Sequence, residues 1–187
     1  MELPKRKSQR LKGYDYSQSN AYFITICTQS RCNLFGEIAN DFFTINKVGE
    51  MVAERLSNIS NTPGVTIDKY VIMPNHVHMI ILISDIGTTH DNGTTQTHNE
   101  TTSDGTTQGS FPTATVSELI QRFKMITTKL YIDGVKNGSY APFDKKIWQK
   151  SFHDHIIRNE TEYLKIWKYI DENPIKWAED THYCIDS

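Results

Sequence analysis

Two runs of strand-forming residues, equal in length and joined by two turn formers, constrain the fold of this chain most strongly. The runs are residues 65–73 and 76–84, and Pro74 and Asn75 lie between them. Proline presets a backbone angle that suits a turn, and asparagine tolerates tight turns. The pattern therefore predicts a β-hairpin.

The second run carries two histidines separated by one apolar residue. Side chains alternate between the two faces of a strand, so His76 and His78 point the same way, roughly 6 to 7 Å apart. Neutral imidazole is a common ligand of divalent metal ions, and this spacing suits two ligands of one ion. The alternative is that both are polar residues on the exposed side of a sheet.

The segments before the hairpin predict a strand and a helix. Residues 21–29 are aromatic and β-branched and alternate from Phe23 onward, which predicts the first strand. Residues 46–59 place apolar side chains near helical spacing, and Asn46 can cap the helix that they predict.

The segments after the hairpin predict a second helix and a fourth strand. Residues 115–130 carry their apolar side chains on one side, with Thr115 or Ser117 as the cap. A turn-rich connection follows at residues 134–142, and the core of residues 146–158 predicts the strand.

The fourth strand carries a second pair of alternating histidines, His153 and His155. They share a face for the same reason as the first pair, and they compete with it as a metal site. The spacing within each strand does not rank the two pairs.

A closing helix begins at Asn159 or Thr161 and ends near Asn173, where Pro174 interrupts the helical pattern. Its apolar stripe is predicted to consist of Tyr163, Ile166, Trp167 and Ile170.

Tyr169 lies at the border of this stripe, and Asn173 stands one helical turn beyond it on the same side. A tyrosine in that place can be a simple packing residue. A phenol is a poor nucleophile at neutral pH because its pKa is near 10, so a reaction that uses it needs a cation near the target. An ion held by His76, His78 and Asn173 could polarise a phosphate in this way, which favours the first histidine pair.

These elements predict an α+β chain with a ferredoxin-like βαββαβ core, an antiparallel sheet and a C-terminal helix that carries the tyrosine. We expect one domain at residues 21–180, a basic arm at residues 1–20 and a tail at residues 181–187. Residues 86–113 are dominated by Thr, Gly, Asn and Asp and have too few apolar side chains to fold, so we expect a disordered insertion.

Charge and composition exclude several classes of protein. The net charge of −2 gives no general excess of positive charge for nucleic acid. No stretch reaches the 18 or so apolar residues of a membrane span, and the N-terminus lacks the apolar core of a signal peptide. The three cysteines have no metal-ligand spacing and indicate a reducing compartment. We therefore expect a cytoplasmic protein without a membrane partner.

Two motifs carry a family resemblance. Residues 74–78, Pro-Asn-His-Val-His, resemble the His-hydrophobic-His motif of the HUH nucleases, which include transposases and relaxases of single-stranded DNA. Residues 147–159, followed by Tyr163 and by residues 169–174, resemble the C-terminal signature of one-tyrosine transposases associated with repetitive extragenic palindromes. The resemblance runs from about Tyr22 to Lys176 without the Thr-rich insertion.

The resemblance implies a metal-dependent single-strand DNA endonuclease and strand transferase that acts on hairpin-forming DNA. His76 and His78 would then bind Mg²⁺ or Mn²⁺, and Asn173 would complete the metal site. Tyr169 would attack the phosphodiester, forming a 5′-phosphotyrosine link and leaving a free 3′-hydroxyl. Such proteins are monomers or homodimers, and a nucleoid-associated location would follow.

Local charge supplies the candidates for DNA contact, because the chain as a whole is slightly acidic. A basic N-terminal arm attracts phosphate, although such an arm can also be merely solvated. The candidates are Lys5, Arg6, Lys7, Arg10, Lys12, Arg122 and Arg158. The resemblance adds His155, as a structural or substrate-positioning residue.

Two other functions fit the same residues. One is a domesticated module that binds DNA hairpins without cutting them. The other is a metallohydrolase that uses a metal-bound water and forms no covalent intermediate.

Overall fold

The computed structural model describes residues 20–39, 42–84 and 114–177. The helices and strands follow the chain as β1 (Asn20–Cys27), β2 (Gly36–Ala39), β3 (Phe42–Ile45), α1 (Lys47–Ser57), β4 (Val65–Met73), β5 (His76–Ile83), α2 (Val116–Lys136), β6 (His153–Ile157) and α3 (Glu160–Glu172). Two short 3-10 helices, η1 (Gln29–Arg31) and η2 (Asn58–Asn61), complete the described elements.

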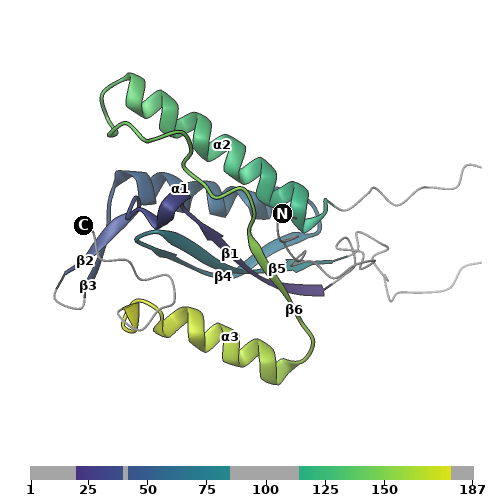
Figure 1. Ribbon diagram of the computed structural model, residues 1–187. Coiled ribbons are helices and arrows are strands. Elements are labelled where there is room, and N and C mark those ends of the chain that lie inside the picture. Colours follow the sequence, from purple (N-terminus) through teal and green to yellow (C-terminus); the bar gives the residue numbers. More distant parts are fainter. Residues whose placement is uncertain (1–19, 40–41, 85–113, 178–187) are drawn as a thin grey trace, which may run out of the picture.

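A four-stranded sheet in the order β4-β5-β1-β6 forms the centre of the fold, and every neighbouring pair is antiparallel. Helices α1 and α2 cover one face of this sheet and α3 covers the other (Figure 1). The predicted hairpin is confirmed as β4 and β5, joined at Pro74 and Asn75. The predicted ferredoxin-like βαββαβ order with an antiparallel sheet is therefore confirmed.

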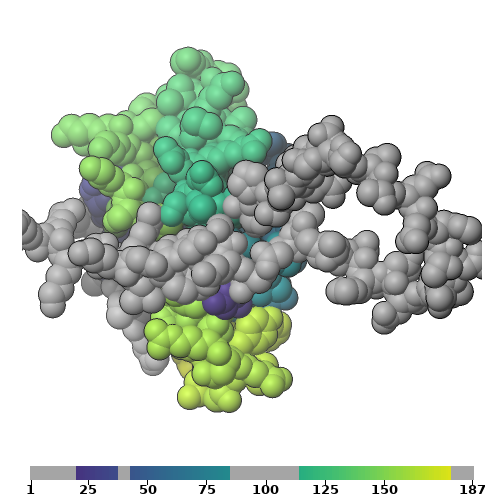
Figure 2. All heavy atoms as spheres, turned by 90° about the vertical axis from the view of Figure 1, so that its right-hand side faces the viewer, coloured from purple at the N-terminus to yellow at the C-terminus, as the bar shows by residue number. Residues whose placement is uncertain are grey.

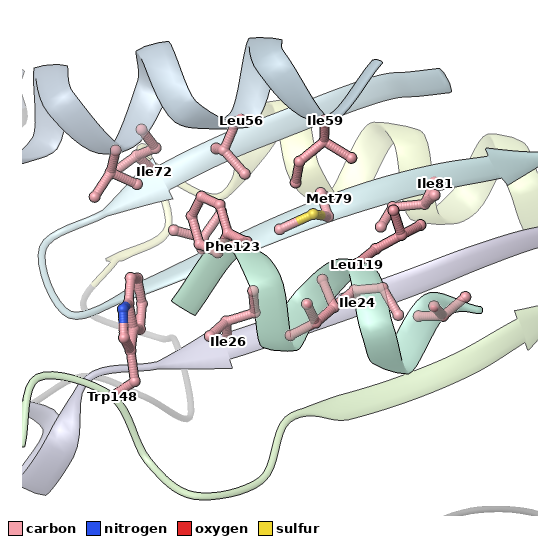
Figure 3. Close-up of a cluster of buried hydrophobic side chains, with 14 of the residues drawn as sticks. Ile24, Ile26, Leu56, Ile59, Ile72, Met79, Ile81, Leu119, Phe123 and Trp148 are labelled. Atoms are coloured by element: carbon pink, nitrogen blue, oxygen red, sulfur yellow. The ribbon is translucent and has the colours of Figure 1, made fainter. Parts of the chain in front are cut away.

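The larger hydrophobic core lies between the sheet and the layer of α1 and α2 (Figure 3). Ile24 and Ile26 of β1 point into it beside Met79 and Ile81 of β5. The alternate residues of β5 are also buried, on the α3 side, which makes β5 a strand covered on both faces. Figure 2 shows α2 and α3 on opposite sides of the strands.

Side-chain caps fix where the helices begin. The Asn46 side chain accepts hydrogen bonds from Val48 N and Gly49 N, as predicted. Thr115, rather than Ser117, caps α2 through a capping box with Glu118. In the same way Asn159, rather than Thr161, caps α3.

The prediction that a turn begins at Gly134 is wrong. Helix α2 continues to Lys136, because the ring of Tyr140 folds back over Gly134 and leaves no room for a side chain there. A Cβ atom at that position would lie 2.1 Å from Cδ2 of Tyr140. The glycine thus serves close packing within the helix rather than a turn.

The fourth strand is shorter than its apolar pattern, because Ile147 and Trp148 precede it and pack into the core. The Trp148 indole donates to Thr127 Oγ1 at 2.9 Å. The sequence also did not predict the small hairpin of β2 and β3, which lies between β1 and α1.

The tail at residues 181–187, the insertion at residues 86–113 and the basic arm before Asn20 lie outside the described residues. None of the described helices has the length and apolar content that crossing a bilayer requires.

Candidate functional site

Strand β5 places His76 and His78 side by side on the sheet face that α3 covers. Both are buried, with 0% and 2% of their surface exposed, and their Nε2 atoms lie 2.9 Å apart. The alternative of polar residues on an exposed sheet face is therefore wrong.

The distance between the two Nε2 atoms suits a shared divalent ion. Octahedral coordination at about 2.1 Å places neighbouring ligand atoms about 3.0 Å apart. The observed 2.9 Å matches two adjacent ligands of such an ion. The two imidazoles thus fit the metal that the family resemblance implies.

Asn75 fixes which nitrogen of His76 faces the site. Its Nδ2 donates to the backbone carbonyl of Arg31 at 3.1 Å, so its Oδ1 faces Nδ1 of His76, 2.8 Å away. An amide oxygen only accepts, so we assign the proton of His76 to Nδ1 and a lone pair to Nε2. His78 has a similar partner. Its Nδ1 lies 2.8 Å from Thr25 Oγ1, which can accept a hydrogen bond from that nitrogen.

Tyr169 brings a hydroxyl to the edge of the histidine pair. Its oxygen lies 3.2 Å from Nε2 of His78 in the same chain. The ring packs edge-on against Phe23, and Phe23 stacks on the His78 ring with centroids 5.3 Å apart. Tyr169 as a whole is 43% exposed, whereas its hydroxyl contact with His78 is partly buried.

Asn173 lies at the C-terminal end of α3, one turn after Tyr169, and is 3% exposed. Among the described residues, no group of three or more His, Cys, Asp and Glu side chains is arranged to hold a metal ion. The amide oxygen of Asn173 is a ligand type that Mg²⁺ and Mn²⁺ accept.

Tyr163, a second tyrosine on α3, has a different environment from Tyr169. The Tyr163 hydroxyl donates to the carboxylate of Asp68 on β4. This hydrogen bond, together with burial and the negative charge of Asp68, raises the pKa of Tyr163 to about 12. Tyr163 is therefore harder to ionise than an ordinary phenol.

A β-bulge on β4 helps to fasten α3 to the sheet. The pairing register with β5 shifts between Ile67 and Lys69, and the inserted residue is Asp68. Lys69 Nζ lies 2.7 Å from Asp171 Oδ1 and 3.7 Å from the centroid of the Trp167 ring. Two consecutive residues of the bulge thus hold α3 on both sides of Tyr169.

Trp167 is 39% exposed, so its predicted place in the apolar stripe of α3 is wrong. It covers the Lys69 ammonium at the border of the helix instead. The apolar contact of α3 with the sheet is centred on Ile170, which packs with Ile80 and Ile157.

The predicted DNA contacts are divided between the two sides of the sheet. His155 pairs across the strands with Phe23, on the face of the candidate site, and its Nε2 lies 2.7 Å from Glu162 Oε1. Arg158 is exposed just after β6. Arg122 lies on α2, on the opposite side of the sheet, beside a cavity of about 400 Å³ that Arg55 also lines. The five basic residues of the N-terminal arm lie outside the described residues.

Sequence reasoning missed three neighbours of the histidine pair, namely Phe23, Thr25 and Asn75. Thr25 and Phe23 reach the site only through the register of β1 with β5, in which Thr25 lies opposite His78. Asn75 directly precedes His76, and that adjacency was the one available signal.

No protein-family model matches the sequence. An uncharacterized protein of Haemophilus influenzae is 38% identical over 180 residues, which are 95% of this chain and 93% of that protein. Among solved structures, a REP-associated tyrosine transposase bound to a REP hairpin has 18% identity and a TM-score of 0.49, covering 95% of this chain and 74% of its own. A protein of Deinococcus radiodurans R1 with a provisional transposase assignment has 13% identity and a TM-score of 0.48. The match covers 87% of this chain and 95% of that protein.

Proposed function

We propose that this chain, which belongs to the same family as the uncharacterized Haemophilus influenzae protein, is a metal-dependent endonuclease and strand transferase of single-stranded DNA. Its βαββαβ fold and the order of its motifs match those of the one-tyrosine HUH transposases that it resembles. One observation carries the proposal. The Tyr169 hydroxyl lies 3.2 Å from Nε2 of His78, which lies 2.9 Å from Nε2 of His76.

In the proposed reaction the Tyr169 oxygen attacks the phosphorus of a DNA phosphodiester. A bond forms between this oxygen and phosphorus, and the bond from phosphorus to the 3′ oxygen breaks. The phenolic proton leaves to solvent, which reaches the 43% exposed side chain, and the departing 3′ oxygen takes up a proton. The products are a 5′-phosphotyrosine and a free 3′-hydroxyl, whose later attack on a phosphotyrosine transfers the strand and restores Tyr169.

His76, His78 and Asn173 would hold Mg²⁺ or Mn²⁺. Bound there, the ion would polarise the phosphodiester and stabilise the negative charge that grows on its oxygens. Nε2 of His78 has a single lone pair, so it cannot hold an ion and also accept a proton from Tyr169. We therefore assign the 3.2 Å contact between the Tyr169 hydroxyl and Nε2 of His78 to positioning of the hydroxyl rather than to general-base catalysis.

The face beside α3 supports a single-stranded substrate. Helix α3 lies mainly over β4 and β5, and β1 and β6 carry Phe23, His153 and His155 on the same face, at the border of the helix. The two histidines are exposed. Bases of a single strand commonly stack on such rings, and hairpin-forming DNA supplies unpaired bases next to a duplex. Such a substrate would place the protein at the nucleoid in the cytoplasm.

The test uses a labelled oligonucleotide with a hairpin and single-stranded flanks, incubated with the purified chain and Mn²⁺. We expect a nick and protein bound to the new 5′ end. Tyr169→Phe abolishes this adduct, and the matched variant Tyr163→Phe retains it. An adduct that persists in Tyr169→Phe contradicts the assignment of the nucleophile.

The same assay separates the two other functions. Nicked DNA without attached protein, unaffected by Tyr169→Phe, would identify a metallohydrolase. Hairpin binding without metal, combined with no cleavage under any divalent ion, would identify a binding module.

A further inference from the structure

A cavity of about 540 Å³ lies just beyond the end of β1, where Cys27 pairs with His76 of β5, and the proposed chemistry does not use it. One wall is formed by residues 28–34, directly after β1, and the other by residues 142–147, between α2 and β6. Its volume is within the range of sites that bind small molecules or parts of larger ones.

Backbone hydrogen bonds join the two walls. Gln29 N donates to the carbonyl of Ile147 at 2.7 Å, and Gln149 N donates to the carbonyl of Cys27 at 3.0 Å. The Phe143 ring packs edge-on against Tyr131, with centroids 5.3 Å apart. The cavity is therefore held open by the fold rather than by a chance arrangement of surface loops.

The walls also contain unusual backbone conformations. Among the described residues, the three non-glycine residues with a positive φ are Ser30 at 58°, Arg31 at 56° and Lys145 at 58°. Ser30 and Lys145 line the cavity, and Arg31 follows Ser30 in the same segment. Such conformations cost free energy, and they persist mainly where the surrounding structure enforces them, often at ligand sites.

The side chains around the cavity suit a nucleotide. Gln29 and Ser30 offer donors and acceptors for the edge of a base, and Phe143 offers an aromatic ring. Lys145 and Lys146 add two positive charges, of which Asp144 offsets one from 3.9 Å away from Lys145. A base with its own phosphate combines the planar, polar and anionic character that this lining matches.

A single side chain links the cavity wall to the histidine pair. Thr28 donates to the Asn75 carbonyl through its backbone at 2.9 Å and its hydroxyl at 3.0 Å. Asn75 in turn binds the carbonyl of Arg31 and Nδ1 of His76. Thr28 also follows Cys27, which lies opposite His76, so this wall begins roughly 6 Å from His76 between Cα atoms.

We propose that this cavity binds an unpaired base of the substrate strand close to the cleaved phosphate. This inference rests on the proposed function and adds a site where the sequence of the strand is read.

The experiment uses photo-crosslinking with the full chain carrying Tyr169→Phe. The hairpin oligonucleotide contains 5-iodouracil at successive positions of its single-stranded flank, and the cross-linked peptides are identified by mass spectrometry. The cavity variant is Lys145→Asn/Lys146→Gln, since asparagine tolerates the positive φ of residue 145. The control is Lys129→Gln/Lys136→Gln on α2, which removes the same charge from exposed positions.

We expect one flank position to cross-link to residues 28–34 or 142–147. The cavity variant should lower this yield and the affinity for the strand about tenfold, and the control should leave both unchanged. Cross-links that map only elsewhere, or equal yields in the cavity variant and the control, overturn the inference. Loss of the cross-link when free deoxynucleotides are added at equal concentration overturns it as well, since the site would then be one for free nucleotides.

The same measurements distinguish failure of the base site from failure of the proposed nuclease function. A wild-type chain that forms the 5′ adduct but gives no cavity cross-link contradicts the base site alone. A cavity cross-link in a chain that forms no adduct supports the base site and contradicts the nuclease.

Discussion

Asn75 is not a proposed metal ligand, yet it determines which nitrogen of His76 carries a lone pair toward the site. Its amide fixes the proton of His76 on Nδ1 and leaves Nε2 for an ion. Partners of this kind commonly change metal affinity by 10- to 100-fold when they are removed. The functional state of the site therefore depends on a turn residue outside the His-x-His motif.

We predict that Asn75→Ala binds Mn²⁺ about 10- to 100-fold more weakly than the wild type. Titration followed by electron paramagnetic resonance measures this directly, and circular dichroism checks that the variant is folded. Asn61→Ala, which removes an exposed amide, is the control. Equal affinity in Asn75→Ala and the wild type would contradict the role of Asn75.

The hydrogen bond between Tyr163 and Asp68 predicts a dependence of stability on pH. The folded pKa of Tyr163, about 12, lies above the usual value near 10, so the folded chain holds the phenolic proton more tightly than the unfolded chain. The stabilisation is fully present below pH of about 10 and is lost as the pH rises through about 12.

Comparison with Tyr163→Phe isolates this contribution. The difference in unfolding free energy between wild type and variant, measured by urea titration, should shrink between pH of about 10 and 12. A difference that stays constant over that window would show that the hydrogen bond does not form.

The sequence was enough to predict which residues form the candidate site, but not which residues contact them. The sequence singled out His76, His78, Tyr169 and Asn173 through alternation in a strand and spacing in a helix. It could not reveal Thr25 opposite His78, because cross-strand contacts depend on a register that is settled only when the sheet assembles.

Helix α3 is the element that brings Tyr169 to the histidines. Its contact with the sheet combines a small apolar cluster around Ile170 with the contacts of the β4 bulge, Asp68 to Tyr163 and Lys69 to Asp171 and Trp167. The bulge therefore influences both the height and the rotation of α3 over the sheet.

We predict that Lys69→Met slows adduct formation about tenfold and leaves DNA affinity unchanged, because small displacements of a nucleophile are costly. Lys69→Arg should restore most of the rate, since it keeps the charge beside Asp171 and Trp167. The control Lys168→Met removes the ion pair with Glu172, which lies on the same helix but holds no strand. Equal rates in Lys69→Met and Lys168→Met would contradict the role of the bulge.

Helix starts followed from local chemistry, whereas helix and strand ends depended on tertiary contacts. Asn46 was identified as a cap, and Thr115 and Asn159 were each one of two candidates, because cap hydrogen bonds lie within the same segment. Gly134 was misread because the ring that packs over it belongs to Tyr140, beyond the helix end. Nothing in the residue pattern of β4 predicts the bulge at Asp68.

The alternation of strands and helices along the chain was enough to predict the ferredoxin-like architecture. The sheet order brings the first strand between β5 and β6, so the histidine pair lies on an inner strand beneath α3. The short distance from Tyr169 to His78 arises within one chain, which supports action in cis.

Mixing two inactive variants tests this arrangement. Tyr169→Phe and His76→Gln, each folded but unable to form the adduct, should remain inactive when combined. Recovery of adduct in the mixture would show that one chain supplies the tyrosine to the metal site of another.

The central claim is that Tyr169 becomes covalently joined to the 5′ end of cleaved DNA. Mass spectrometry of the proteolysed adduct, formed by the wild-type chain with Mn²⁺ and a hairpin oligonucleotide, tests it most directly. We predict a single nucleotide-bearing peptide, modified at Tyr169. Modification at Tyr163, or cleaved DNA with no attached peptide, would contradict the account.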